Sequence, residues 1–163
     1  MFQDQLQACL PDLRRFALSL TRNGDAADDL VQDCAERALR KQHLYADGTS
    51  LKAWLMTLLI NLYRNQLRAL SHRPPHDMIE DVHVAAPDTL AGKLALSDVS
   101  KALDLLPDDQ REVLLSVVIG GLSYKEVALA LDMPLGTVMS RLGRARAKLR
   151  SLTGKLSTNE VAP

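Results

Sequence analysis

The sequence predicts an all-α protein built from two small helical domains joined by a flexible linker. Leu and Ala dominate a composition that is 47% hydrophobic and only 4% aromatic, which favours helices over strands. Apolar residues recur at helical spacing in two blocks, and the stretch between them, SHRPPHDMIEDVHVAAP, holds prolines, acids and no sustained periodicity. We therefore expect domains at residues 1–70 and 94–156, a linker at 71–93 and a disordered tail at 157–163.

In the N-terminal domain we expect helices at about residues 3–20, 25–41 and 51–70. Pro11 lies inside the first helix, so we expect a kink or a division there, and Asn23-Gly24 is a typical stop signal. The second and third helices each carry an apolar face and a separate polar face at helical spacing. The polar face of the second helix contains Asp29, Gln32, Asp33 and Glu36, and that of the third contains Asn61, Arg64, Asn65 and Arg68.

In the C-terminal domain we expect helices at about residues 94–106, 107–119, 123–131 and from 135 to beyond 149. Pro107 suits the first position of its helix, and Gly120-Gly121 suits the end of the same helix. Ser123 and Glu126 have the spacing of a capping box, which predicts where the short third helix begins.

A short capped helix, a tight turn at 132–134 and a second helix are typical of a helix-turn-helix. Val127, Leu131, Val138 and Leu142 supply its expected core, with Ala128 small where the helices cross. The second helix is strongly basic, because residues 137–155 contain six Lys and Arg and no acid. The candidate DNA-binding residues of this helix are Gly136, Thr137, Ser140, Arg141 and Arg144. The plainer interpretation is a solvated basic helix in an ordinary bundle.

The overall charge limits what such a helix can do alone. The formal net charge is zero, whereas a protein that binds DNA tightly by itself is usually basic. Acids gather at 25–36 and again at 77–88, away from the basic stretch, and this uneven distribution suggests several partners. Cys9 and Cys34 are expected to be small buried side chains in a reducing cytoplasm, and no signal peptide or membrane-spanning run is evident.

The sequence offers no support for catalysis, for a cofactor or for a small-molecule substrate. It has no phosphate-binding glycine loop, no HExxH motif and no nucleophile elbow. His72, His76 and His83 have irregular spacing and no supporting cysteine, so no metal site is expected.

Three stretches together resemble the extracytoplasmic-function (ECF) family of RNA polymerase sigma factors. LPDDQREVLLSVVIGGLSYKEVALALDMPLGTVMSRLGRARAKL is similar to the family's region 4 domain. DAADDLVQDCAERALR is similar to the region 2 helix that holds RNA polymerase, and GTSLKAWLMTLLINLYRNQLRAL to the adjoining helix that reads the −10 element. The resemblance covers most of the chain, in the family's order.

The resemblance implies a sigma factor that recruits core polymerase to promoters and helps to melt them, without being an enzyme. It implies contact of Asp29, Gln32, Asp33 and Glu36 with the β′ clamp helices, and of the C-terminal domain with the β flap. It implies −35 recognition by the helix-turn-helix residues given above, and −10 contact by Ser50, Lys52, Asn61, Arg64, Asn65 and Arg68. It also implies a loop at 47–50 that captures a flipped base, an acidic linker in the polymerase's nucleic-acid channels, and an anti-sigma factor, often membrane-anchored, as a further partner.

The sequence departs from the family pattern at a few positions. Asp132 stands where the family often has Gly, and Met139 stands where it often has Lys, which removes one phosphate contact. Asp33 replaces the usual Glu of the DLVQ motif.

Two other functions compete with this one. A free-standing repressor or activator would use the same helix-turn-helix but would need a dimer surface, and no heptad or second exposed apolar stripe is evident. A sigma mimic that sequesters an anti-sigma factor is usually fused to a receiver domain, for which this chain is too short, and it has no need of the basic recognition helix.

Overall fold

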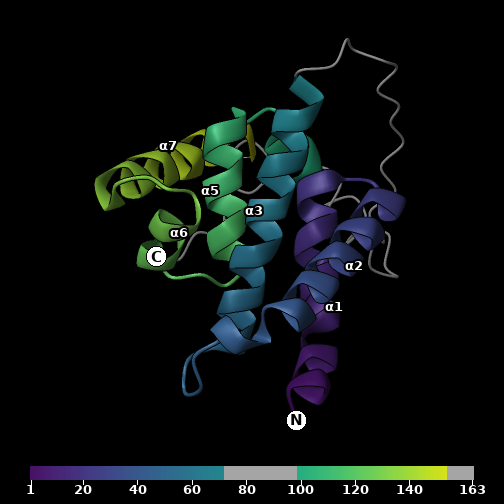
Figure 1. The fold of residues 1–163 in the computed structure, drawn as a ribbon. Coiled ribbons are helices and arrows are strands. Elements are labelled where there is room, and N and C mark those ends of the chain that lie inside the picture. The colour runs from purple at the N-terminus through teal and green to yellow at the C-terminus, as the bar shows by residue number, and fades with distance from the viewer. Residues whose placement is uncertain (72–98, 154–163) are drawn as a thin grey trace.

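Helices form most of residues 1–71 and 99–153, which are the residues that this computed structural model describes (Figure 1). The N-terminal unit contains α1 (Phe2–Thr21), α2 (Gly24–Arg40), the short 3-10 helix η1 (Gln42–Leu44) and α3 (Leu51–Ser71). The C-terminal unit contains helical residues 99–104, α5 (Asp108–Val118), α6 (Tyr124–Ala130) and α7 (Leu135–Thr153). The described residues contain no strand, as the composition predicted. The expected linker beyond Ser71, its histidines and the expected tail lie outside them.

Helix α1 runs through Pro11 as one helix, so the expected division into two pieces is wrong. A proline removes the hydrogen bond to the carbonyl one turn earlier, here that of Gln7. Pro11 and Gln7 are both exposed, so water can bind the carbonyl that has lost its donor.

Helix α1 ends just before Asn23-Gly24, as expected, but Asn23 also starts the next helix. Arg22 takes the left-handed conformation at the end of α1, with φ of 54°. The Asn23 side chain then accepts a hydrogen bond from the Ala26 N–H at 2.9 Å, which makes Asn23 the N-cap of α2 and Gly24 its first residue.

Pro107 lies one position before the place predicted for it. Its ψ of 146° is extended, so Pro107 is the N-cap of α5 and Asp108 is the first helical residue. Asp108 and Asp109 still fall in the first turn, where negative charge is favoured by the helix dipole. Gly120 and Gly121 end α5 as expected, and Gly121 has a left-handed φ of 68°.

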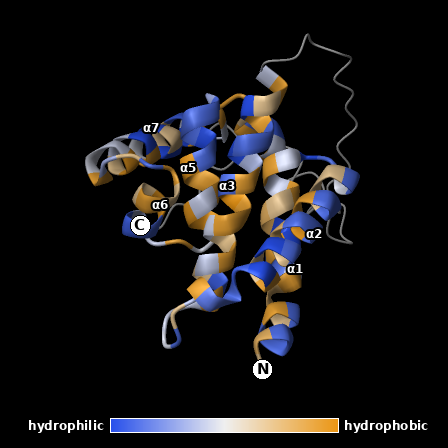
Figure 2. Ribbon diagram, in the orientation of Figure 1, coloured by the Kyte–Doolittle hydropathy of each residue, from blue (hydrophilic) through white to orange (hydrophobic). Residues whose placement is uncertain are grey.

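One hydrophobic cluster extends through both units. Its N-terminal part includes Phe16, Leu30 and Leu59, and its C-terminal part includes Val113 and Val138, all fully buried. Apolar residues concentrate along α1, α3 and α5 where these helices lie side by side (Figure 2). Burial of this apolar surface, at about 25 cal/mol per Å², provides the main driving force for the packing.

The two units pack directly against each other, a contact that the sequence did not predict. Helix α3 packs against α6 and α1 against α5 (Figure 1). A Cβ atom added to Gly120 would lie 2.6 Å from the Ser116 carbonyl oxygen and 3.3 Å from Cζ of Phe16. The Ser116 carbonyl therefore leaves no room for a Cβ at Gly120, and the Phe16 ring of α1 packs close to the same position.

Candidate nucleic-acid interface

The helix-turn-helix predicted from the sequence is present in α6 and α7. The Ser123 hydroxyl accepts from the Glu126 N–H at 3.1 Å, and the Glu126 carboxylate accepts from the Ser123 N–H at 3.1 Å. This reciprocal capping satisfies two donors that a helix start otherwise leaves unpaired. Val127, Leu131 and Val138 are buried between the two helices, as expected.

The turn between these helices depends on a left-handed residue at Asp132. Asp132 has φ of 52°, and this positive value explains why a glycine suits the position. The Met133 N–H donates to the Ala128 carbonyl at 3.0 Å, and the Asp132 N–H donates to the Leu129 carbonyl at 3.4 Å. This pair of hydrogen bonds closes the end of α6 and aims α7 away from it.

Helix α7 presents most of its candidate DNA-binding residues to solvent. Gly136, Ser140 and Arg144 are exposed, while Thr137 and Arg141 are half-buried. The Arg141 Nε lies 3.5 Å from Oδ2 of Asp109 on α5, and its Nη1 lies 3.9 Å from the Met133 sulfur. Asp109 therefore holds the Arg141 guanidinium close to the first turns of the helix.

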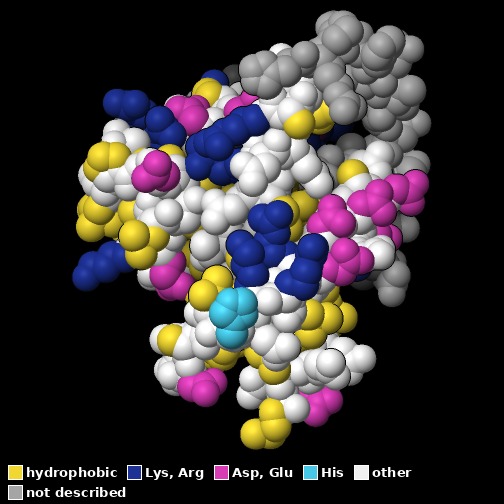
Figure 3. Space-filling model, viewed as in Figure 1, with side chains coloured by type: hydrophobic (Ala, Val, Ile, Leu, Met, Phe, Trp, Pro, Cys, Tyr) yellow, Lys and Arg dark blue, Asp and Glu magenta, His cyan; other side chains and the backbone are white. Residues whose placement is uncertain are grey.

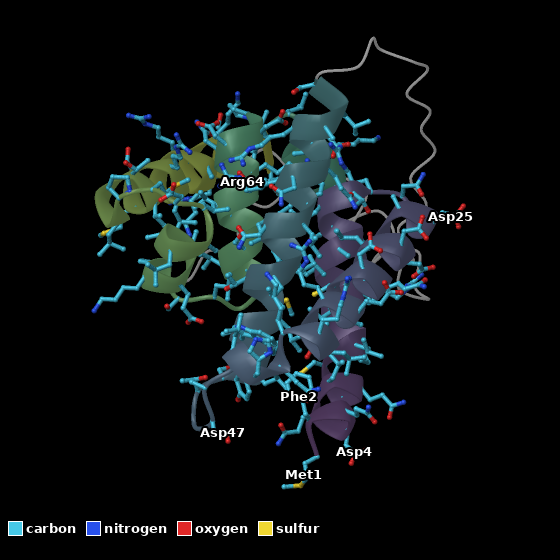
Figure 4. The ribbon with its side chains drawn as sticks, in the orientation of Figure 1. Met1, Phe2, Asp4, Asp25, Asp47 and Arg64 are labelled. Atoms are coloured by element: carbon cyan, nitrogen blue, oxygen red, sulfur yellow. The ribbon has the colours of Figure 1, made fainter. Side chains whose placement is uncertain are left out.

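The polar face of α3 is divided between solvent and the C-terminal unit. Asn61, Asn65 and Arg68 are exposed, as a nucleic-acid contact requires. Arg64 instead projects toward the C-terminal unit (Figure 4), where its Nη1 donates to the Leu131 carbonyl at 2.7 Å. Its Nε also lies 3.2 Å from Oε1 of Glu112. The structure therefore separates Arg64 from the other three residues of the predicted stripe.

The loop before α3 borders an open hollow of about 370 Å³. Ser50 forms part of its wall, and its hydroxyl accepts from the Ala53 N–H at 3.2 Å at the start of α3. Glu126 of the C-terminal unit lines the same hollow. Trp54 packs against Tyr45 with ring centroids 5.6 Å apart, which supports the base of the loop. Lys52 is exposed but pairs with Asp12, Nζ to Oδ2 at 3.1 Å, and Asp47 lies at the tip of the loop (Figure 4).

The polar face of α2 is exposed to solvent along its predicted stripe. Asp29, Gln32, Asp33 and Glu36 are all exposed, and Gln32 Nε2 donates to Glu36 Oε1 at 3.4 Å. Acidic side chains gather over α2 in the space-filling view, whereas basic side chains gather over the centre and upper left of the same face (Figure 3). On this face the acidic cluster and the central basic cluster lie next to each other (Figure 3).

Buried charges between the two units are the functional candidates that sequence reasoning missed. Arg111 donates to the carbonyls of Ser19 and Leu20 at 2.8 and 3.2 Å, and burial lowers its pKa. Glu112 faces Arg64, yet burial, the larger effect, raises the pKa of its carboxyl. In the sequence both residues look like an ordinary solvated helix face, so no local signal could have identified them.

Within residues 1–71 and 99–153, no group of three or more His, Cys, Asp or Glu side chains could hold a metal ion. None of the helices in this part of the chain is both long and apolar enough to span a bilayer.

Comparison with known proteins agrees with this geometry. Residues 96–149 match the family model for sigma-70 region 4, and residues 6–60 match the model for the sigma2 domain of PhyR. The chain is 39% identical over 156 residues to the ECF RNA polymerase sigma factor EcfG of Rhodopseudomonas palustris, covering 92% of this chain and 83% of that protein. It is 34% identical over 146 residues to the ECF sigma factor SigM of Mycobacterium tuberculosis, covering 90% and 74%.

Solved structures of sigma factors also match this chain. The sigma factor RpoE of Bartonella quintana, in complex with the anti-sigma factor NepR, matches with a TM-score of 0.77 and 37% identity over 96% of this chain and 98% of that one. CnrH in complex with the cytosolic domain of CnrY matches with a TM-score of 0.67 and 27% identity, covering 96% and 89%. The helix-turn-helix, the α2 and α3 surfaces and these matches agree in one conclusion: the chain belongs to the ECF family of RNA polymerase sigma factors.

Proposed function

We propose that this chain binds core RNA polymerase through α2 and directs it to promoters through two separate DNA contacts. The −35 element is read by α7, and the −10 element is bound by α3 and the loop before it. The chemistry of RNA synthesis belongs to the polymerase, and the chain supplies recognition. We place its action in the cytoplasm, where core polymerase and promoter DNA are found.

The observation that carries this proposal is the exposed, basic face of α7 within a capped helix-turn-helix. Ser140 and Arg144 are free to reach DNA, and Arg141 is held beside them by Asp109. Hydroxyl and guanidinium groups on one helix face suit phosphate oxygens and guanine edges. The first turns of such a helix are where base contacts usually occur.

The acidic stripe of α2 fits a protein partner better than DNA. Asp29, Asp33 and Glu36 would repel phosphates, but they can pair with basic side chains of a polymerase subunit. We assign this stripe to the β′ clamp helices and the C-terminal unit to the β flap. An anti-sigma factor is a further partner, because RpoE is seen bound to the anti-sigma factor NepR, and CnrH is seen bound to the cytosolic domain of CnrY.

Run-off transcription tests the proposal. The chain is mixed with core polymerase on a library of genomic fragments, and the transcripts are sequenced. We expect transcripts from a limited set of fragments that share two spaced elements, and none from core polymerase alone. An absence of such transcripts from a folded chain that nevertheless binds an anti-sigma factor would favour the sigma mimic.

A further inference from the structure

Two arginines reach across the interface in opposite directions, and each binds the carboxyl end of a helix in the other unit. Arg111 of α5 donates to the Ser19 and Leu20 carbonyls at the end of α1. Arg64 of α3 donates to the Leu131 carbonyl, which caps α6. Helix carboxyl ends carry partial negative charge and unpaired carbonyls, so both contacts satisfy groups that would otherwise lack a donor.

Ion pairs strengthen both ends of this interface. Arg64 faces Glu112, and Arg22, the left-handed residue that ends α1, pairs with Asp104 of the C-terminal unit. Arg111 is only 7% exposed, and a guanidinium buried to this degree is costly unless its donors are used. The contact between the units is therefore a specific polar arrangement and not only apolar packing.

The same arrangement occupies groups that the −10 element would need. Arg64 cannot bind a phosphate or a base while its guanidinium donates to the Leu131 carbonyl and pairs with Glu112. Glu126 lines the hollow beside Ser50, so it places a carboxylate where a base would enter. Contact between the units and contact with DNA at these groups are mutually exclusive.

We propose that this interface is an autoinhibitory latch, formed by Arg22, Arg64, Asp104, Arg111 and Glu112. In the free chain the C-terminal unit covers part of the −10 surface, and the surface becomes available only when the units separate. The latch lowers the DNA affinity of the free chain by the fraction of molecules that are open. The role of Arg64 in DNA binding rests on the proposed function. The contact between the two units does not depend on that function.

The test compares Arg111→Gln with Arg14→Gln in the full chain. Arg111 is buried and is not one of the residues assigned individually to DNA or to the β′ clamp helices. Arg14 pairs with Asp28 at 2.8 Å inside the N-terminal unit, so its loss removes the same charge and an ion pair without touching the interface. Asp104→Asn breaks the latch at a second, partly exposed point. Circular dichroism melting establishes that each variant is folded.

The first measurement is the distance between the units. Spin labels are attached through Gln7→Cys on α1 and Lys148→Cys on α7, both exposed positions, in a Cys9→Ser background that leaves the buried Cys34 in place. We expect one narrow distribution of distances for the otherwise unchanged chain and for Arg14→Gln, and a broader distribution that extends to longer distances for Arg111→Gln and Asp104→Asn. Unchanged distances in both latch variants would overturn the proposal.

The second measurement is the affinity of the free chain for a single-stranded oligonucleotide that carries the −10 sequence recovered by run-off transcription. We expect about a tenfold gain for Arg111→Gln although a positive charge has been lost, and no gain for Arg14→Gln. Longer distances without a gain in affinity would show that the latch does not control DNA binding. If Arg64→Gln left promoter opening by the holoenzyme unchanged, the −10 assignment itself would fail, whatever the distances show.

Discussion

Asp132 shows how one residue shapes the recognition element. Its left-handed backbone closes α6 and sets the direction of α7, although most residues with a Cβ avoid this conformation. Asp tolerates it better than most because a short polar side chain can hydrogen-bond locally. The resemblance implies Gly at this position in many family members, and the positive φ supplies the physical reason.

We expect Asp132→Val to lower the free energy of unfolding by about 1–2 kcal/mol, because a β-branched side chain is strained at this φ. Asp132→Gly should leave it nearly unchanged. Asp47→Val is the matched control, since Asp47 is exposed and does not have a positive φ. Urea denaturation measures all three variants. An Asp132→Val chain as stable as wild type would mean that the turn does not require the left-handed conformation.

Arg141 and Arg144 lie one turn apart on α7 but differ in their surroundings. Arg141 is held by Asp109 near the helix start, whereas Arg144 is exposed further along. We therefore assign base reading to Arg141 and phosphate contact to Arg144.

We expect Arg141→Ala to change the ranking of −35 variants, because a bidentate base contact discriminates by roughly 1–3 kcal/mol. Arg144→Ala should weaken all promoters alike and lower the salt slope by about one. Transcription from a −35 library with both variants measures the difference. An unchanged ranking with lower activity would remove base reading from Arg141, and no effect of either change would mean that α7 is not the recognition helix.

Among the elements, α2 shows most clearly how one helix buries one face and leaves the other free. Leu30 and Cys34 are fully buried on one side, and the acidic stripe is exposed on the other. Reversing a charge on the exposed side should therefore cost little core energy.

We expect Asp33→Arg to weaken binding to core polymerase by at least about tenfold, the scale of a charge pair at an interface, while thermal melting stays close to wild type. Asp4→Arg on α1 makes the same charge change away from the stripe and should bind normally. Affinity for core polymerase is the measurement. Normal binding by a folded Asp33→Arg chain would remove this face from the interface.

Elements with strong local signals could be predicted from the sequence. The capping box at Ser123, the core at Val127 and Val138, and the exposed stripe of α2 all depend on neighbours within about one or two turns. Arg111 could not be predicted, because its carbonyl partner Ser19 lies 92 residues away and nothing near Arg111 indicates it. The division at Pro11 was wrongly predicted because the sequence does not show that the Gln7 carbonyl is exposed and can bind water instead of the missing donor.

At the scale of the whole molecule, charge and packing act in the same direction. The net charge is zero, so general attraction to DNA is weak, and acidic side chains gather over α2 (Figure 3). In the packing of the two units, the Arg64 guanidinium donates to the Leu131 carbonyl rather than facing solvent. Both features predict that promoter binding depends on a partner that the chain must first join.

The affinity of the chain for one promoter fragment, measured with and without core polymerase at the same salt concentration, tests this dependence most directly. We predict sequence-specific binding in the range of roughly 10⁻⁸ M or tighter when core polymerase is present. For the free chain we predict only weak binding of about 10⁻⁶ M or worse, with no preference for the promoter over scrambled DNA. Tight, sequence-specific binding by the free chain would contradict the account and identify a free-standing repressor or activator instead.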